Sequence, residues 1–431
     1  MGKATNDRPA ASLPESSAHA RVLILGGGFA GIGAARELKN ADANVTLVDK
    51  HDYHTFQPLL YQVATGLLEQ TAVGHPIRDL VQKQANARVH QDTVTAIDLD
   101  AREVRFNELE PLTYDYLVLG LGAEVNFFGV EGAPEHAFPL YTLADAVRLK
   151  SHVLKTWEAA DRKPELIDDG ALNIVVVGGG PTGIETAGAV AELYHGVFPK
   201  DYPDVLPEQA RITLVEAGPE LFPMFKPNIR TYTEKALAKR GVEVLTGEVV
   251  ASIAPRRVTL KSGTVLEAHT LVWGAGLQGN RLVQSLGLEL GRGNRIGVDE
   301  ELRIPSHPEV YAVGDVAAIT DAKTDQVLPQ LGSVALQAGE HAGETIARRV
   351  AGKATKRFKY KDKGTMATIG RGSAVVQMLG GRTMKGKTAS LAWGTVHLAL
   401  LPTNEDRAKA VVDWAGAGLT HQRGARITVE T

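Results

Sequence analysis

Two stretches of this chain repeat the same local design and lie about 150 residues apart. They read RVLILGGGFAGIGAAR over residues 21–36 and NIVVVGGGPTGIETAG over residues 173–188. Each has a short apolar run, then glycines at G-x-G-x-x-G spacing, then small residues at a helical period, which predicts strand, turn and helix. The three glycines permit the turn, the approach of a pyrophosphate and the packing of helix on strand. With the N–H groups of the helix N-terminus, each stretch predicts a dinucleotide cradle.

An acidic residue completes each cradle at the end of the next apolar run. Asp49 ends the run NVTLVD, and Glu216 ends the corresponding run in ARITLVEAG. A carboxylate at this place can accept hydrogen bonds from ribose hydroxyls, so two complete sites imply two different dinucleotides. A 2′-phosphate about 4 Å from Glu216 would be repelled by about 4 kcal/mol per charge pair at an intermediate dielectric. The second site is therefore expected to take NADH in preference to NADPH.

Composition limits the remaining possibilities. A chain of 431 residues predicts two or three domains, and a net charge of -3 gives no reason to expect nucleic acid as a partner. The polar residues 1–20 lack the apolar core of a secretory signal, which predicts a disordered tail and a protein that stays in the cytoplasm. The chain has no cysteine, which excludes disulfides and iron–sulfur clusters held by thiolates. Electrons must then pass through an organic cofactor, and no metal site is expected.

Further segments resemble the two-dinucleotide flavoprotein superfamily, in which a first domain binds FAD and an inserted second domain binds a nicotinamide nucleotide. They are YDYLVLGLGAE at 114–124, LVWGAGLQGN at 271–280 and HPEVYAVGDVA at 307–317. Within this superfamily, residues 48–68, 121–146 and 180–193 resemble the type II NADH dehydrogenases, which are single-chain NADH:quinone oxidoreductases of respiratory membranes. Sibling disulfide reductases and sulfide:quinone oxidoreductases need thiols beside the flavin, so the lack of cysteine excludes them.

The resemblance implies an α/β fold of two Rossmann-like domains, the second inserted in the first, and a C-terminal membrane-attachment region. The expected FAD-binding domain comprises residues 21–145 and 290–352, the NADH-binding domain residues 146–289, and the membrane-interface region residues 353–431. The expected FAD contacts are Gly26, Gly28, Phe29, Ala30, Gly31, Asp49, Lys50, Gly122, Gly314 and Asp315. The expected NADH contacts are Gly178, Gly180, Thr182, Gly183, Glu216 and Gly276.

Glu185 is the leading candidate for a catalytic role. A carboxylate in the first turn of a helix can simply be favoured by the helix dipole. The resemblance instead implies that the glutamate of this G-I-E triplet lies between flavin and nicotinamide, where it would position NADH or handle protons. Reduction of a quinone to a quinol consumes two protons, so a nearby acid is needed.

The expected quinone contacts are Ser333, Gln337 and Lys363, and Gln337 and Lys363 are also expected to be catalytic. The family pattern A-Q-x-A-x-Q corresponds to GSVALQ at 332–337, where Gln337 is kept and Ser333 replaces the first glutamine. A hydroxyl can still hydrogen-bond a quinone carbonyl, directly or through water. Lys363 is suggested by the family-like stretch YKDKGTMATIG. The alternatives are a polar helix-terminal residue for Gln337 and a solvated side chain for Lys363.

The C-terminal part has the features of a membrane-surface segment. Between Lys353 and Lys387 there are ten Lys or Arg residues and one acid, Asp362, and an anionic leaflet attracts each base by about 1 kcal/mol. The run SLAWGTVHLALLP is too short to span a bilayer, so Trp393 and Trp414 predict two helices lying in the interface with their rings at headgroup depth. The alternative is a helical hairpin that closes the domain or forms a dimer contact.

The resemblance therefore implies a peripheral enzyme on the cytoplasmic face of the cell membrane, a homodimer that does not pump protons. It would pass a hydride from NADH to FAD and then electrons to menaquinone or ubiquinone. A second hypothesis keeps the first step but reduces a soluble protein such as ferredoxin. A third is a nucleotide-sensing flavoprotein with low turnover.

Overall fold

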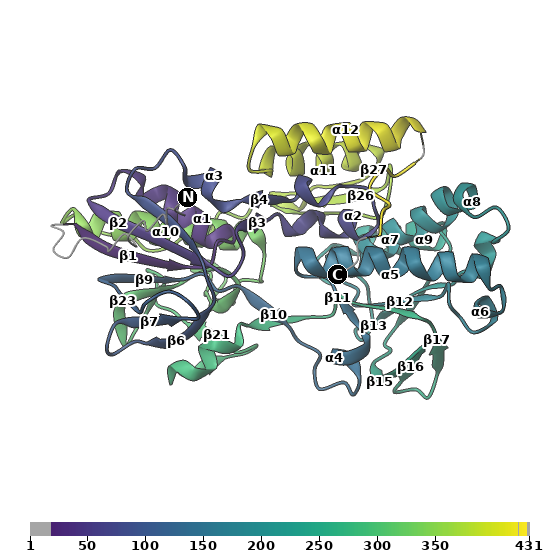
Figure 1. The fold of residues 1–431 in the computed structure, drawn as a ribbon, viewed down its shortest axis with the longest axis horizontal. Coiled ribbons are helices and arrows are strands. Elements are labelled where there is room, and N and C mark those ends of the chain that lie inside the picture. Colours follow the sequence, from purple (N-terminus) through teal and green to yellow (C-terminus); the bar gives the residue numbers. More distant parts are fainter. Residues whose placement is uncertain (1–18, 421, 429–431) are drawn as a thin grey trace, which may run out of the picture.

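The computed structural model describes residues 19–420 and 422–428. Two sheets lie side by side, each with helices against it, and a third part built from the C-terminal residues covers the junction between them (Figure 1). The predicted α/β class with two Rossmann-like sheets is confirmed. Residues 1–18 of the predicted tail lie outside the described residues.

The strands of the first sheet come from parts of the chain that precede and follow the second sheet. Its six strands follow the order β22-β23-β9-β1-β2-β5, namely Arg303–Ile304, His307–Ala312, Tyr116–Leu119, Ala20–Leu25, Ala43–Asp49 and Ala87–Gln91. All pairs are parallel except β22 with β23. Four successive residues of β1 are buried, because helices cover both faces of a parallel sheet.

Helices α1 (Phe29–Glu37) and α10 (Gly332–Val350) pack closely beside this sheet. A Cβ at Gly339 would lie 1.9 Å from the carbonyl oxygen of Ala30, so the two backbones meet with no room for a side chain. This contact fixes the first half of α10 against the start of α1. Helix α3 (Ile77–Val81) also contacts α1.

The second sheet has five parallel strands. Their order is β11-β18-β12-β13-β14, namely Phe138–Pro139, Thr270–Trp273, Ile174–Val177, Ile212–Glu216 and Val242–Thr246. The helices of this part are α4 (Ala133–His136), α5 (Leu143–Arg162), α6 (Glu165–Asp168), α7 (Pro181–Glu192), α8 (Phe198–Asp201) and α9 (Pro227–Ala238).

The domain boundary predicted between residues 145 and 146 falls inside α5. This helix starts earlier, at a capping box in which the N–H of Asp145 donates to Thr142 Oγ1 at 3.1 Å and Asp145 Oδ2 accepts from the N–H of Thr142 at 2.8 Å. Strand β11 already belongs to the second sheet. The two residues of β11 are too few to show a strand pattern in the sequence, so the start of the second sheet at Phe138 could not be predicted.

Smaller sheets complete the two nucleotide domains. An antiparallel pair, β10 (Ala123–Val125) with β19 (Leu277–Gly279), joins the domains. The others are β3-β4 (Tyr53–Thr55, Gly74–Pro76), β6-β7-β8 (Val94–Asp98, Glu103–Phe106, Leu112–Thr113), β15-β16-β17 (Val250–Ala254, Arg257–Leu260, Val265–Glu267) and β20-β21-β24 (Leu290–Gly291, Arg295–Gly297, Ala317–Ala318).

The C-terminal part consists of a three-stranded sheet and two helices. The strands are β25 (Thr365–Thr368), β26 (Ala374–Gln377) and β27 (Thr383–Gly386), followed by α11 (Lys387–Leu400) and α12 (Asn404–Thr420). Strand β25 contacts α7, which in turn contacts α2 (Leu60–Ala64) of the first domain. Within residues 19–420 and 422–428, none of the helices has the length and apolar character needed to cross a membrane.

One detail of the predicted membrane segment is wrong. Two helices are present, but Trp393 is buried and its ring stacks on His397 with centroids 4.2 Å apart. Trp414 lies beside it, with ring centroids 5.9 Å apart. The Trp393 ring is therefore covered by the protein and is not one of the exposed rings that the sequence led us to expect.

Candidate functional site

The first glycine turn has the geometry of a phosphate cradle. Gly26 has a φ of 104°, and a Cβ at this position would lie 2.2 Å from the oxygen of Gly120. A Cβ at Gly31 would lie 1.8 Å from the oxygen of Gly26, whereas nothing lies within 4 Å of one at Gly28. The outer two glycines are thus needed for the turn and the helix contact, and the middle one faces open space at the N-terminus of α1.

The second turn repeats this geometry. Gly178 has a φ of 114°, and its Cβ would lie 2.7 Å from the oxygen of Gly274. A Cβ at Gly183 would lie 1.8 Å from the oxygen of Gly178, and the position of Gly180 is again open. Thr182 follows in the first turn of α7 and is half-buried. Both cradles fit a diphosphate group.

The two predicted ribose-binding acids are held in matching ways. Asp49 Oδ2 accepts from the N–H of Gly27 at 2.6 Å, at the end of β2. Glu216 Oε2 accepts from the N–H of Gly179, and its Oε1 accepts from Gly218 at 2.6 Å. Each carboxylate therefore lies beside its own glycine turn, and Lys50 is exposed next to the first.

The segment HPEVYAVGDVA, residues 307–317, lies against the first glycine turn. A Cβ at Gly314 would lie 3.2 Å from the Cβ of Ala30. Asp315 Oδ2 accepts from the hydroxyl of Tyr141 at 3.1 Å, and that hydroxyl accepts from the N–H of Ala123 at 3.1 Å, directly after Gly122. Burial raises the pKa values of Tyr141 and Asp315. Sequence reasoning missed Tyr141, although it lies in the family-like segment 121–146.

Phe29 is half-buried at the start of α1. Its ring meets those of His54 and Phe56 at centroid distances of 5.0 and 5.7 Å. The ring also lies against Gly332, whose Cβ would come within 3.3 Å of it. Phe29 thus helps to join the first turn to the start of α10.

Glu185 is buried where the second domain meets the C-terminal part. Its Oε1 accepts from the N–H of Thr368, in β25, at 3.1 Å. Burial raises the pKa of Glu185 to about 8, so its protonated form dominates at neutral pH. A protonated carboxylic acid in this position can donate a proton.

A chain of polar groups lies close to Glu185. The indole N–H of Trp414 donates to Gln62 Oε1 at 2.7 Å, and Gln62 Nε2 donates to the hydroxyl of Tyr61 at 2.7 Å. Tyr61 is buried, and its pKa is raised by burial and also by the nearby carboxylate of Glu185. These groups connect α12 with the surroundings of Glu185 through α2.

The three predicted acceptor residues lie near one another, around the start of α10. Ser333 Oγ lies 2.9 Å from the hydroxyl of Tyr360, and Gln337 exchanges two hydrogen bonds with the backbone of Lys361 at 2.9 and 3.1 Å. Lys363 is exposed two residues further on. Both ends of the Gln337 amide are thus used to hold the backbone of Lys361.

A cavity of about 1270 Å³ lies between α2, α7 and the C-terminal helices. Sequence reasoning did not foresee it, because its walls come from segments far apart in the chain. Its lining includes Tyr61, Gln62, Thr368, Trp393, Trp414 and Arg423. Thr368, whose N–H donates to Glu185, is part of this lining, so the cavity extends close to Glu185.

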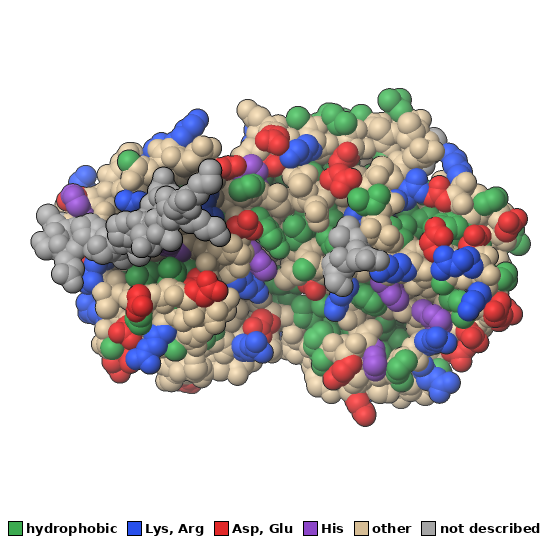
Figure 2. All heavy atoms as spheres, viewed as in Figure 1, with side chains coloured by type: hydrophobic (Ala, Val, Ile, Leu, Met, Phe, Trp, Pro, Cys, Tyr) green, Lys and Arg blue, Asp and Glu red, His purple; other side chains and the backbone are tan. Residues whose placement is uncertain are grey.

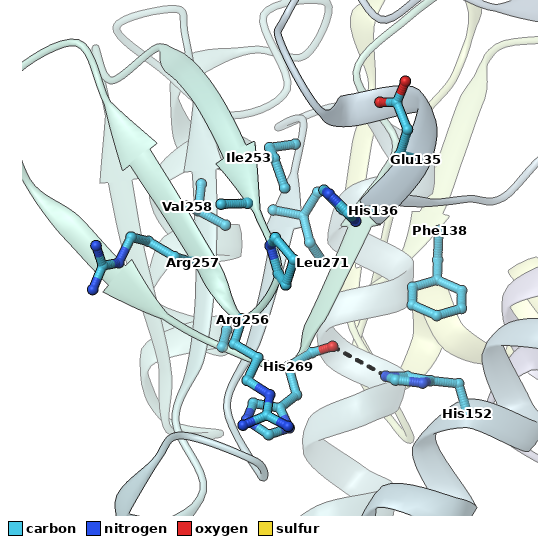
Figure 3. A pocket seen from close by; sticks show the side chains of 13 residues that line it. Glu135, His136, Phe138, His152, Ile253, Arg256, Arg257, Val258, His269 and Leu271 are labelled. Atoms are coloured by element: carbon cyan, nitrogen blue, oxygen red, sulfur yellow. Dashed lines mark hydrogen bonds between the residues drawn. The ribbon is translucent and has the colours of Figure 1, made fainter.

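A second pocket, of about 300 Å³, is formed by the second domain and is not lined by either glycine turn (Figure 3). His152 Nε2 donates to the backbone oxygen of His269 at 3.1 Å, and burial lowers the pKa of both histidines. His136 also lines it. Within residues 19–420 and 422–428, no group of side chains is suited to hold a metal ion.

The family model described as pyridine nucleotide-disulphide oxidoreductase matches residues 20–339. The type II NADH:quinone oxidoreductase Ndh of Mycobacterium tuberculosis (strain ATCC 25618 / H37Rv) is 35% identical, over 94% of this chain and 89% of that relative. The type II NADH:quinone oxidoreductase of Staphylococcus aureus (strain NCTC 8325 / PS 47) is 30% identical, over 94% of this chain and 98% of the relative. The solved structure of NDH2 from Plasmodium falciparum in complex with NADH has a TM-score of 0.86 at 21% identity, covering 95% of this chain and 100% of that chain.

Proposed function

The chain belongs to the type II NADH:quinone oxidoreductases, and we propose that it oxidises NADH through a bound FAD and passes the electrons to a membrane quinone. The observation that carries this proposal is the pair of equivalent open cradles, at Gly28 and Gly180, in two domains joined through β10 and β19. A chain with one substrate and no second nucleotide would not need the second cradle. The relatives favour a quinone over a soluble protein as the acceptor.

The two cradles have different proposed occupants. The turn with Asp49 and the Tyr141–Asp315 pair would hold FAD, and the turn with Glu216 would hold NADH. Bound FAD supplies a ring that accepts a hydride and returns two electrons to the acceptor. The protein contributes the orientation of the two nucleotides and the exclusion of water between them.

We assign Glu185 to proton handling. Its pKa of about 8 keeps it protonated at neutral pH, and the N–H of Thr368 fixes the direction of its carboxyl group. The quinol product needs two protons, and a buried neutral acid can give one without first breaking an ion pair. The hydrogen bonds from Trp414 through Gln62 to Tyr61 hold the Tyr61 hydroxyl in place close to Glu185.

The acceptor site is proposed at the start of α10, with Ser333 as its direct contact. Among the residues that the structure describes, the Ser333 hydroxyl pairs with another hydroxyl, that of Tyr360, so it can turn toward a quinone carbonyl at small cost. Gln337 would act by holding the segment that leads to Lys363. The aromatic lining of the 1270 Å³ cavity, from Tyr61, Trp393 and Trp414, suits a lipid-soluble substrate or its tail.

Attachment to the cytoplasmic face of a membrane is proposed through α11 and α12. Leu391, Val412 and Leu419 are 75, 68 and 85% exposed, and hydrophobic side chains are visible along the α12 edge in Figure 2. The ten basic residues between Lys353 and Lys387 would strengthen binding to anionic lipids. A homodimer stays part of the proposal.

The test is stopped-flow spectroscopy of the purified protein under anaerobic conditions. We expect a flavin spectrum, rapid bleaching by NADH, and rapid reoxidation by a menaquinone or ubiquinone analogue. A protein without flavin, or one that NADH does not bleach, would contradict the proposal. Reoxidation by ferredoxin and not by quinone would support the soluble-acceptor hypothesis instead.

A further inference from the structure

Phe128 has an unusual conformation and exposure. It lies on the loop between β10 and α4 (Figure 1), and its side chain is 63% exposed. Its backbone φ is 51°, in the left-handed region that residues with a Cβ adopt only with strain. A large apolar ring is thus held in water by a strained backbone, which solubility and folding do not explain.

The surrounding contacts hold Phe128 over one particular turn. The N–H of Phe128 donates to Asn126 Oδ1 at 2.8 Å, and the N–H of Asn126 donates to the oxygen of Gly276 at 3.1 Å. The indole N–H of Trp273 donates to the backbone oxygen of Asn126 at 3.0 Å. A Cβ at Gly276 would lie 2.6 Å from the tip of the Phe128 ring, so the ring lies directly on this glycine.

The order of strands shows which half of a dinucleotide would reach this turn. Strand β12, with the second cradle at its end, lies between β13 and β18. Glu216 ends β13, and in such sheets the acid at this place binds the adenosine ribose. The other half of the nucleotide must then extend across the end of β18, toward Gly276 and Phe128.

We propose that the Phe128 ring forms a wall of the nicotinamide side of the NADH site. The bound nucleotide would pack against the exposed ring and shield it from water. This inference rests on the proposed function, because it assigns NADH to the second cradle. The strained, hydrogen-bonded loop gives the ring a fixed position before the substrate arrives, which lowers the entropy lost on binding.

The test compares Phe128→Ala with Leu206→Ala, an exposed apolar side chain that lines neither cradle nor either pocket. Titration calorimetry measures binding of NAD⁺ to the oxidised holoenzyme, and competition measures the inhibition constant of ADP against NADH. Loss of one aromatic contact should weaken NAD⁺ binding about three- to tenfold. The constant for ADP, which lacks the nicotinamide half, should not change, and Phe128→Tyr should retain the affinity.

The outcomes separate the inference from the function on which it rests. If wild-type protein neither binds NAD⁺ nor has its flavin bleached by NADH, the proposed function fails. If wild type binds NAD⁺ and Phe128→Ala binds it equally well, only the inference fails. If Phe128→Ala binds NAD⁺ and ADP more weakly to the same extent, the inference also fails, because that result indicates general distortion of the domain. A thermal unfolding curve that matches that of the wild type would show that the variant is folded.

Discussion

The N–H of Thr368 donates to the carboxylate of Glu185 at 3.1 Å, although the two residues are 183 positions apart. This hydrogen bond joins the C-terminal sheet to α7, at the fifth residue of that helix. It places the strongest candidate for an acid between the nucleotide domain and the elements proposed to meet the membrane. The pKa of about 8 for Glu185 follows from burial at this junction.

Activity should depend on the protonation of Glu185. A raised pKa means that the acid form is present below about pH 8 and is lost above it. The quinone-dependent step should therefore slow as the pH rises through this value. Glu185→Gln cannot donate this proton, so it should be about a hundredfold slower and should lose this limb of the pH profile. Stopped-flow measurement of flavin reoxidation by quinone between pH 6 and 9 gives both the rate and its pH profile. If Glu185→Gln keeps the decline at high pH, Glu185 is not the group that causes this decline.

Glu216 should decide between NADH and NADPH. Glu216→Gln removes the charge and keeps one carbonyl oxygen for the turn amides. The ratio of kcat/KM for NADPH to that for NADH should rise by about tenfold or more, because repulsion of the 2′-phosphate is relieved. Asp49→Asn, in the other cradle, is the control and should leave the ratio as it is. Similar ratios for wild type and Glu216→Gln would mean that charge at this position does not select the nucleotide.

Ser333 should affect only the acceptor reaction. Ser333→Ala removes the hydroxyl next to Tyr360 and should raise KM for a soluble quinone analogue about three- to tenfold. The rate of flavin bleaching by NADH should stay at the wild-type value. If bleaching slows and the quinone KM does not move, Ser333 does not belong to the acceptor site.

The ion pair between Arg423 and Glu192 should stabilise the fold. Arg423 is 4% exposed and also donates to the oxygens of Thr65 and Ala189, so it holds the C-terminal segment against both α2 and α7. Arg423→Met should lower the free energy of unfolding by about 3 kcal/mol or more, since it leaves buried acceptors unpaired. Arg357→Met breaks an exposed pair with Glu300 and should cost at most about 1 kcal/mol. Denaturant titration compares them, and equal losses would show that the buried pair is not special.

Membrane binding should depend on the exposed residues of α12. Val412→Asp and Leu419→Asp should reduce co-sedimentation with anionic phospholipid vesicles, because each puts a charge on the apolar face. Leu206→Asp changes another exposed apolar residue, away from α12, and should bind as wild type does. Activity with a soluble quinone should not change in any of the three. If both α12 variants co-sediment with the vesicles as well as the wild type does, α12 is not the surface that attaches to the membrane.

The two cradles could be predicted from the amino-acid sequence alone. Gly26, Gly28 and Gly31, and likewise Gly178, Gly180 and Gly183, act through a turn and a helix start only a few residues long, so their spacing contains the necessary information. Asp49 and Glu216 could be placed for the same reason, because each ends the strand next to its turn. Family resemblance supplied the expectation of a quinone.

The contacts between distant segments become visible only in the three-dimensional structure. In the structure, the hydroxyl of Tyr141 donates to Asp315, the Gln337 amide holds Lys361, and the Phe128 ring lies on Gly276. The Trp393 ring is also buried, which a short apolar helix does not reveal because either face could be the buried one. These contacts depend on how two domains and a C-terminal sheet pack together. Local patterns along the chain cannot contain that information.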